Sequence, residues 1–318
     1  MTYLRRIGAS PLRTPPLVLG GNVFGWTADK AASFAVLDAF VAAGGTMIDT
    51  ADVYSAWVPG HRGGESEMMI GEWLRASGKR PDIATKVGMM PGPKNEEGGG
   101  EKLAPAQIAA ACDASLNRLG VEQIALYYAH QDDEATPQES YMEAFAKLVA
   151  AGKVGTLGAS NFHAARLKSA NAVARAAGTP HFEVLQNEYN LVSRHKFEGE
   201  VQDYCIEHNI GVLPFYSLAA GFLTGKYRSD DDFKSVRGGR MDRTLIGRRM
   251  KVLPAMDAIA ADTGASLPQI ALAWLAAQPG VTAPIASATS VVQLEDLLGA
   301  ARLELTADQL ATLDAAGA

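Results

Sequence analysis

The sequence has little cysteine and no hydrophobic run long enough to cross a membrane. Its 318 residues include two cysteines, Cys112 and Cys205. Each lies in an expected helix, so we interpret both as small buried side chains in a reducing compartment. No apolar run approaches the roughly 18 residues that a membrane span needs, and no apolar signal core follows residues 1–6. These absences predict a cytoplasmic protein.

Several binding fingerprints are also missing. The sequence has no Gly-x-Gly-x-x-Gly run for a Rossmann site and no Gly-x-Ser-x-Gly elbow, and Gly225-Lys226 is followed by Tyr227 rather than the Ser or Thr of a Walker motif. The 6 histidines lack metal-ligand spacing, so no metal is expected. The net charge of -6 argues against nucleic acid or an anionic membrane as the partner. We expect a small-molecule partner, and the sequence leaves the oligomeric state open.

The sequence does contain a regular alternation of short apolar runs and longer alanine-rich runs with helical spacing. The predicted strands are residues 17–20, 46–49, 82–86, 123–129, 154–159, 182–186, 211–216 and 282–286. The predicted helices are residues 31–43, 68–77, 106–119, 138–151, 164–177, 197–208, 267–277, 291–300 and 307–315. Such alternation favours a parallel sheet, and eight repeats favour a closed barrel. We therefore predict an α/β fold: a single domain over residues 1–318, a (β/α)8 TIM barrel with extra helices.

The sequence predicts two long irregular loops. Long loops of this kind in compact domains are usually functional or mobile. One covers residues 88–101. The other follows the seventh strand, from residue 218 to about residue 249, and is rich in Gly, Asp and Arg.

Polar residues stand at the ends of the predicted strands, where the mouth of such a barrel forms its active site. In chain order they are Asp49, Lys86, His130, Ser160, Asn161, Gln186, Tyr216 and Ser287. Each alone has an ordinary explanation, such as a turn cap, a surface charge or a core histidine. Together they predict a site, and a lysine emerging there needs a counter-charge, for which Asp49 is the nearest candidate.

This set of residue types suits carbonyl reduction. A cationic Lys86 near the phenol of Tyr54 is expected to lower its pKa and make it an acid/base near neutral pH. His130 would donate a hydrogen bond to the substrate oxygen, which gains negative charge as a hydride reaches the carbon. The hydride must come from a cofactor.

Several runs of the sequence resemble the aldo-keto reductase family, in its bacterial-type form with a short C-terminus. The matching runs are residues 47–54, 64–67, 84–88, 127–130, 158–162, 185–190 and 221–227. Together they span most of the chain, from about residue 17 to residue 298. The resemblance implies a catalytic tetrad of Asp49, Tyr54, Lys86 and His130, with Tyr54 as the proton donor.

The resemblance also implies an extended NADP(H) across the barrel mouth. The residues expected to hold it are Gly21, Asn22, Ser160, Asn161, Gln186, Tyr216, Ser217, Leu218, Gly221, Ser287, Thr289 and Gln293. Many relatives carry a basic residue near Thr289 and an asparagine at Leu297, and both are missing here, so NAD(H) stays possible. Arg237, Arg240 or Arg243 of the long loop is a candidate replacement for the missing charge. Phe24, Trp26, Trp57 and residues 89–93 are the expected substrate contacts and suggest an apolar or ring-bearing substrate.

We therefore expect an NADP(H)-dependent oxidoreductase that reversibly reduces an aldehyde or ketone to an alcohol. One alternative is an NAD-dependent sugar or alcohol dehydrogenase using the same site. A second is a lyase in which Lys86 forms a Schiff base. A third is a non-catalytic, cofactor-sensing regulatory subunit, since a fold does not fix a function. The sequence leaves open the substrate and the preferred direction.

Overall fold

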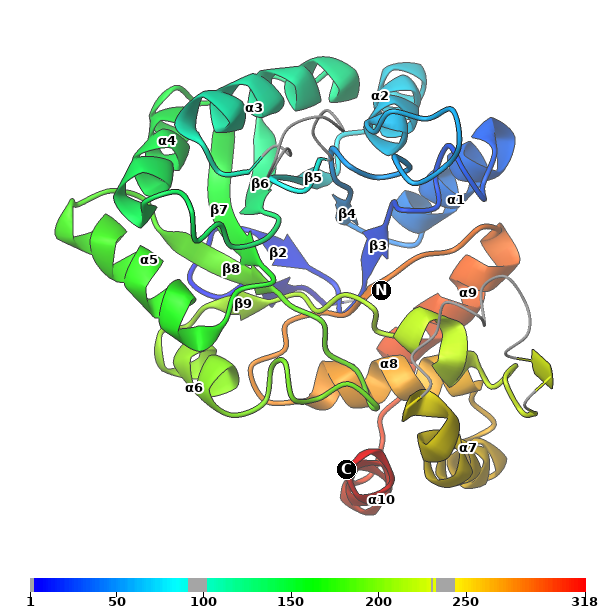
Figure 1. Ribbon diagram of the computed structural model, residues 1–318. Coiled ribbons are helices and arrows are strands. Elements are labelled where there is room, and N and C mark those ends of the chain that lie inside the picture. Colours follow the sequence, from blue (N-terminus) through cyan, green and yellow to red (C-terminus); the bar gives the residue numbers. More distant parts are fainter. Residues whose placement is uncertain (1–2, 91–101, 230, 233–243) are drawn as a thin grey trace.

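The computed structural model, which describes residues 3–90, 102–229, 231–232 and 244–318, contains one curved sheet of eight parallel strands (Figure 1). The strands run in the order β10-β3-β4-β5-β6-β7-β8-β9. Their bounds are β3 Val18–Gly20, β4 Met47–Asp49, β5 Asp82–Val87, β6 Ile124–Ala129, β7 Val154–Ser160, β8 Phe182–Gln186, β9 Gly211–Val212 and β10 Ile285–Ala286. Backbone hydrogen bonds close the barrel between its outer strands: Thr282 N donates to Val212 O (2.8 Å) and Ile285 N to Pro214 O (2.9 Å). The predicted (β/α)8 architecture is confirmed.

Helices surround the sheet (Figure 1). Their bounds are α1 Lys30–Ala42, α2 Glu65–Ser77, α3 Pro105–Leu119, α4 Gln138–Ala150, α5 Ala164–Ala176, α6 Glu200–Glu207, α7 Thr244–Thr263, α8 Leu267–Ala277, α9 Val291–Gly299 and α10 Ala307–Gly317. Two short 3₁₀ helices, η1 Ala219–Thr224 and η4 Ala300–Arg302, add to them. Helices α7 and α10 pack on each other and extend the barrel on one side (Figure 1).

Each strand alternates its side chains between the barrel interior and the helix layer. Val18 and Met47 point into a small apolar cluster inside the barrel, whereas their neighbours Leu19 and Ile48 belong to the larger core beneath the helices. Every second residue of a strand shares a face. The same alternation continues to the strand ends, where the side chains that face the barrel interior are polar.

A two-stranded hairpin closes the end of the barrel where the strands begin. Strands β1 (Arg5–Arg6) and β2 (Arg13–Thr14) pair in antiparallel fashion. Ile7, between them, is fully buried in the interior cluster. Gly8 adopts a φ of 55° and lies so close to Gly211 that a Cβ atom there would stand 2.2 Å from its nitrogen. This hairpin was not predicted from the sequence.

The structure corrects the predicted loop after the seventh strand. Residues 219–224 form η1, and a 20-residue helix, α7, begins at Thr244. The sequence prediction placed irregular chain there and no helix before Leu267. The seventh and eighth strands are also shorter than predicted, each with two residues in ladder geometry.

Two smaller expectations have clear outcomes. Both cysteines are free and buried, as their small apolar surroundings predicted. Within the described residues, every helix is too short or too polar to pass through a lipid bilayer.

Candidate active site

The catalytic residues proposed from the sequence form the next layer above the apolar interior of the barrel. Met47, Ala84 and Tyr128 face that interior. Two residues further along the same strands or just beyond them come Asp49, Lys86 and His130. Because alternate residues share a face, all three enter the barrel mouth from adjacent strands β4, β5 and β6. The predicted convergence follows from strand register alone.

Lys86 is the centre of this layer, and its side chain is fully buried. Its Nζ donates to Asp49 Oδ1 (2.6 Å), to the Thr50 carbonyl oxygen (2.7 Å) and to Tyr54 Oη (3.1 Å). An ammonium group has three protons, so each has an acceptor. Such a pair tolerates burial because every charge-bearing group is matched.

Tyr54 lies on the loop that follows β4, and the next residue, Ser55, has a left-handed φ of 76°. The phenol reaches back over the strand end to Lys86, whose Nζ lies 4.8 Å from the centre of the ring. The ring also contacts His130 edge-on, with 6.2 Å between ring centres. The Tyr54 phenol, the Lys86 amine and the His130 imidazole therefore lie in one cluster, together with the Asp49 carboxylate.

The charges of the cluster differ from the sequence-based expectation in one respect. Burial raises the pKa of Tyr54, and the nearby Lys86 amine opposes this without offsetting it, so the expected lowered pKa is wrong for the net value. Burial alone would lower the pKa of Lys86, but the Asp49 carboxylate and the Tyr54 phenol outweigh it and raise the pKa. At neutral pH the phenol therefore holds its proton and the amine stays charged.

His130 is neutral in this surrounding. Burial, followed by the positive charge of Lys86, holds the pKa of His130 well below its ordinary value. Its backbone is fixed on both sides, since His130 N donates to Val87 O (2.8 Å) and its carbonyl accepts from Asn161 Nδ2 (2.9 Å). A neutral imidazole has one N–H donor for a ligand oxygen.

The amide-bearing residues of β7 and β8 are tied to the same cluster. Gln186 Nε2 donates to Asp49 Oδ2 (2.8 Å), so both oxygens of this carboxylate are engaged. Ser160 Oγ donates to the Gln186 carbonyl oxygen (2.7 Å), and both side chains are buried. Asn161 is exposed at a left-handed φ of 57°. Asn161 is thus the most accessible of the three, while Gln186 has a role in orienting Asp49 that the sequence did not indicate.

The backbone strain of the described chain concentrates at this mouth. Five of its six non-glycine residues with positive φ lie there, namely Ser55, Asn161, Tyr216, Ala219 and Ala220. Such conformations cost free energy and gather at ligand sites. The chain then turns sharply at residues 218–221, where Gly221 N donates to Leu218 O (2.9 Å) and Ala219 N donates to Tyr216 O (2.7 Å). Tyr216, just before it, leaves 55% of its surface exposed.

Lys226 adds a positive charge beside this turn. A Cβ atom on Gly221 would lie 3.9 Å from Lys226 Nζ, so the amine stands beside the left-handed turn. Lys226 belongs to the run 221–227 that resembles the family, but it was not among the predicted site residues. Its signal was present: Lys226 is the first cation after the predicted seventh strand.

The remaining predicted cofactor residues fall into two groups. Ser287 Oγ donates to Asn22 Oδ1 (2.5 Å), and the backbone and hydroxyl of Thr289 both donate to Gln293 Oε1 (3.0 Å each), so these pairs line one side of the mouth. Ser217 is buried and donates to Ile285 O (2.8 Å), which helps close the barrel. The candidate arginines 237, 240 and 243 lie outside the described residues.

The predicted substrate residues differ in how exposed they are. Trp26 and Trp57 are 38% and 45% exposed and meet edge to face, with 5.6 Å between ring centres. Trp57 in turn contacts Tyr54, at 6.0 Å. Phe24 is fully buried in the main core, so its ring has no exposed surface in this structure. Met89 is exposed, while residues 91–93 lie outside the described residues.

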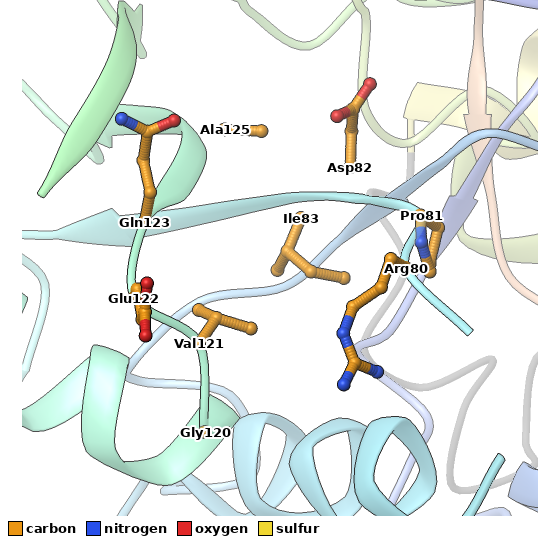
Figure 2. A pocket seen from close by; sticks show the side chains of 9 residues that line it. All are labelled: Arg80, Pro81, Asp82, Ile83, Gly120, Val121, Glu122, Gln123 and Ala125. Carbon is orange, nitrogen blue, oxygen red and sulfur yellow. The ribbon is translucent and has the colours of Figure 1, made fainter. Parts of the chain in front are cut away.

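A hollow at the opposite end of the barrel contains none of these residues. Figure 2 shows its lining, which comes from residues 80–83 around the start of β5 and from residues 120–123 and Ala125 before and within β6. In the part of the chain that the structure describes, no three His, Cys, Asp or Glu side chains are grouped to hold a metal. The chemistry of the described chain is therefore concentrated at the mouth.

Known proteins resemble this chain over most of its length. A family model described as the aldo/keto reductase family matches residues 16–318. Aldo-keto reductase yakc [NADP(+)] of Schizosaccharomyces pombe is 34% identical over 86% of this chain and 79% of its own length. Norsolorinic acid reductase B of Aspergillus parasiticus is 31% identical, covering 98% and 83% respectively. Aryl-alcohol dehydrogenase [NADP(+)] of Phanerodontia chrysosporium is 31% identical, covering 95% and 82%.

Proposed function

Because the chain belongs to the aldo/keto reductase family and is therefore an oxidoreductase, we propose that it reduces aldehydes or ketones with NADP(H), using Tyr54 as the acid. The observation that carries this proposal is the buried Lys86 amine held between Asp49 Oδ1 (2.6 Å) and Tyr54 Oη (3.1 Å). A neutral phenol beside a fixed cation is a proton donor whose anion is stabilised as it forms.

The mouth has features that fit a dinucleotide cofactor. The exposed ring of Tyr216 would stack on a flat ring, and the Lys226 amine beside the turn at residues 218–221 would bind a diphosphate. Asn161 would bind the carboxamide, with Ser160 and Gln186 behind it. When bound, the cofactor supplies the hydride. Relatives named for NADP(+) favour NADP(H) over NAD(H).

The residues of the tetrad would divide the remaining work. Tyr54 donates its proton to the carbonyl oxygen, and Lys86 stabilises the phenolate that this leaves. Asp49 holds the amine in place, helped by Gln186. The neutral His130 donates a hydrogen bond that orients the carbonyl and stabilises its developing charge. In the reverse direction the phenolate would take the proton from an alcohol.

We further propose that the substrates carry an aromatic ring. Trp26 and Trp57 stand partly exposed beside Tyr54 and offer two ring faces at an angle. Aromatic pairs of this kind add binding energy beyond their buried area. Two relatives are named for aryl alcohol and norsolorinic acid. The cytoplasmic location stays a prediction.

The test is a panel of aromatic and aliphatic carbonyls assayed with NADPH and with NADH. We expect turnover with NADPH, and kcat/KM higher for aromatic aldehydes than for aliphatic ones of equal size. Trp57→Ala should reduce this preference with little change for the aliphatic aldehydes. No turnover on any carbonyl would refute the proposed reaction, and equal kcat/KM values would refute the proposed substrate class.

A further inference from the structure

We propose that the first turn of α2 is a positioning device, in which Ser66 and Glu67 hold the strand ends that carry Asp49 and Lys86. Neither side chain touches the reacting groups. Both are fully buried, although serine and glutamate are mostly surface residues. The inference deepens the proposed function and rests on it for its link to catalysis.

Ser66 connects the ends of β3 and β4. Its Oγ donates to the Gly21 carbonyl oxygen (2.7 Å) and lies 2.8 Å from Thr50 Oγ1. Because the single hydroxyl proton of Ser66 goes to Gly21, Thr50 must donate to Ser66. These two successive hydrogen bonds, from Thr50 to Ser66 and from Ser66 to Gly21, hold Thr50 in place. The carbonyl oxygen of Thr50 is the one that accepts from Lys86 Nζ (2.7 Å).

Gly21 suits this close approach, because a side chain there would crowd its neighbours. A Cβ atom there would lie 3.0 Å from the Asp49 carbonyl oxygen and 3.1 Å from Ser66 Oγ. Gly21 N also donates to Asp49 O (2.7 Å). Gly21 was predicted as a cofactor residue, and the structure gives it an additional place in the support beneath Asp49.

Glu67 connects α2 to β5. Its Oε1 accepts from Thr85 Oγ1 (2.5 Å) and its Oε2 from Arg118 Nε (2.6 Å). Thr85 precedes Lys86 and points to the opposite face of the sheet. Gly64 makes room for this, because a Cβ atom there would stand 2.6 Å from the Arg118 side chain. The strand is therefore held one residue away from the catalytic amine.

These contacts fix position and do not merely add stability. Ser66 holds Thr50, whose carbonyl is one acceptor of the Lys86 amine, and Glu67 holds the strand that carries Lys86 through Thr85. A displacement of about 1 Å in a catalytic group costs roughly 100-fold in rate.

Loss of the Ser66 hydroxyl leaves the Thr50 hydroxyl without its acceptor and the Gly21 carbonyl with Phe24 N (3.0 Å) as its remaining donor. Thr50 is then held by its backbone bond to Ala84 O (2.8 Å) alone, and its carbonyl can shift away from the amine.

The test compares Ser66→Ala and Thr50→Val with two matched variants. Thr50→Val keeps the shape of the side chain and removes its hydroxyl, whereas Thr50→Ser keeps the hydroxyl. Ser10→Ala is the control, because Ser10 is also fully buried and donates one hydrogen bond, to Ile7 O (2.6 Å), at the hairpin end. The readouts are kcat and KM, and the titration of Tyr54 by ¹³Cζ-tyrosine NMR, with the signal assigned from Tyr54→Phe.

We expect folded Ser66→Ala and Thr50→Val to lose about tenfold or more in kcat with KM for NADPH little changed. The Tyr54 titration should move upward in both as the amine shifts away, return toward wild type in Thr50→Ser, and stay unchanged in Ser10→Ala. Unchanged kcat and titration in both variants would overturn the inference, as would equal changes in Ser10→Ala. If the wild type turns over no carbonyl but the titration still moves, the proposed function fails and the positioning role stands.

Discussion

At the scale of single residues, the proposed role of Tyr54 makes its protonation state the factor that should decide which direction of the reaction is faster. Burial raises the pKa of Tyr54, so the phenol is protonated near neutral pH. Reduction of a carbonyl needs this protonated form, while oxidation of an alcohol needs the phenolate. The Lys86 cation, 3.1 Å away, contributes most after the proton has left.

Tyr54→Phe should lower kcat by roughly 10³-fold while NADPH binding is kept. The ring remains, so its contacts with Trp57 and His130 persist, but the proton donor is lost. Steady-state kinetics together with fluorescence titration of NADPH measure the two effects. Tyr141→Phe is the control, because that buried hydroxyl accepts only a helix-layer hydrogen bond from Gln138 (3.0 Å). A kcat near wild type would exclude Tyr54 as the acid.

The pH dependence of reduction should reflect Tyr54 alone over the neutral range. The pKa of His130 lies well below its ordinary value, so the imidazole is neutral and kcat should stay flat from about pH 6 to 8. The rate should fall only at high pH, where Tyr54 loses its proton, and alcohol oxidation should rise there. A pH–rate profile with an inflection near pH 6.5 that disappears in His130→Gln would contradict this assignment.

The identity of the site residues was largely predictable, whereas their environment was not. Strand register places Asp49, Lys86 and His130 at one mouth, and register follows from an apolar alternation that the sequence displays. The net pKa of Tyr54 depends on how much protein surrounds it, which no local pattern gives. The same holds for Phe24, because a loop aromatic facing the core looks in sequence like one facing the ligand.

At the scale of elements, the packing of the barrel interior beneath the site leaves no room for added volume. Gly158 on β7 faces Tyr128 on β6, and a Cβ atom there would lie 2.4 Å from the phenol ring. Tyr128 stands beside Lys86 in the strand register, with the Lys86 amine 5.8 Å from the centre of its ring. A shift of Tyr128 would therefore reach the catalytic layer.

Gly158→Ala should destabilise the protein by about 1–3 kcal/mol and lower kcat as well. The contact is with a rigid, fully buried ring, so the strand or the ring must move. Urea denaturation and steady-state kinetics give both quantities. Gly247→Ala on α7 is the comparison, because open space surrounds that position and alanine should stabilise the helix by roughly 0.5–1 kcal/mol. Equal stabilities of the two variants would contradict the packing argument.

The elements missed from the sequence have identifiable causes. Helix α7 contains Pro254 and begins shortly after a run rich in glycine and arginine, so its start resembled a loop. The hairpin β1–β2 has only two residues in each strand, too few to show alternation. The last two barrel strands close the sheet mainly through single hydrogen bonds, which a propensity pattern does not reveal.

At the scale of the whole molecule, the proposed site residues lie at the ends of most barrel strands, so a ligand bound there would contact segments from most of the chain. Its binding should therefore stabilise the fold as a unit, by about 2.7 kcal/mol at a concentration one hundred times Kd. The single domain over residues 1–318 stays a prediction.

NADPH should accordingly raise the Tm more than NADH at equal concentration, and Lys226→Ala should reduce the rise with both cofactors if its amine binds the diphosphate they share. Thermal denaturation with each cofactor measures this. Lys147→Ala serves as the control, since that lysine is 72% exposed and pairs with Glu143 on α4. A Lys226→Ala variant with the wild-type rise would remove Lys226 from the proposed site.

The two indoles at the rim give the molecule a built-in optical reporter. Trp26 and Trp57 are partly exposed beside Tyr54, whereas Trp73 and Trp274 are buried among helices. Emission from the exposed pair overlaps the absorption of a reduced nicotinamide, so occupancy of the mouth should quench the red-shifted part of the fluorescence spectrum and leave the blue-shifted part of the buried pair. Ligand binding can therefore be followed by intrinsic tryptophan fluorescence without an added label.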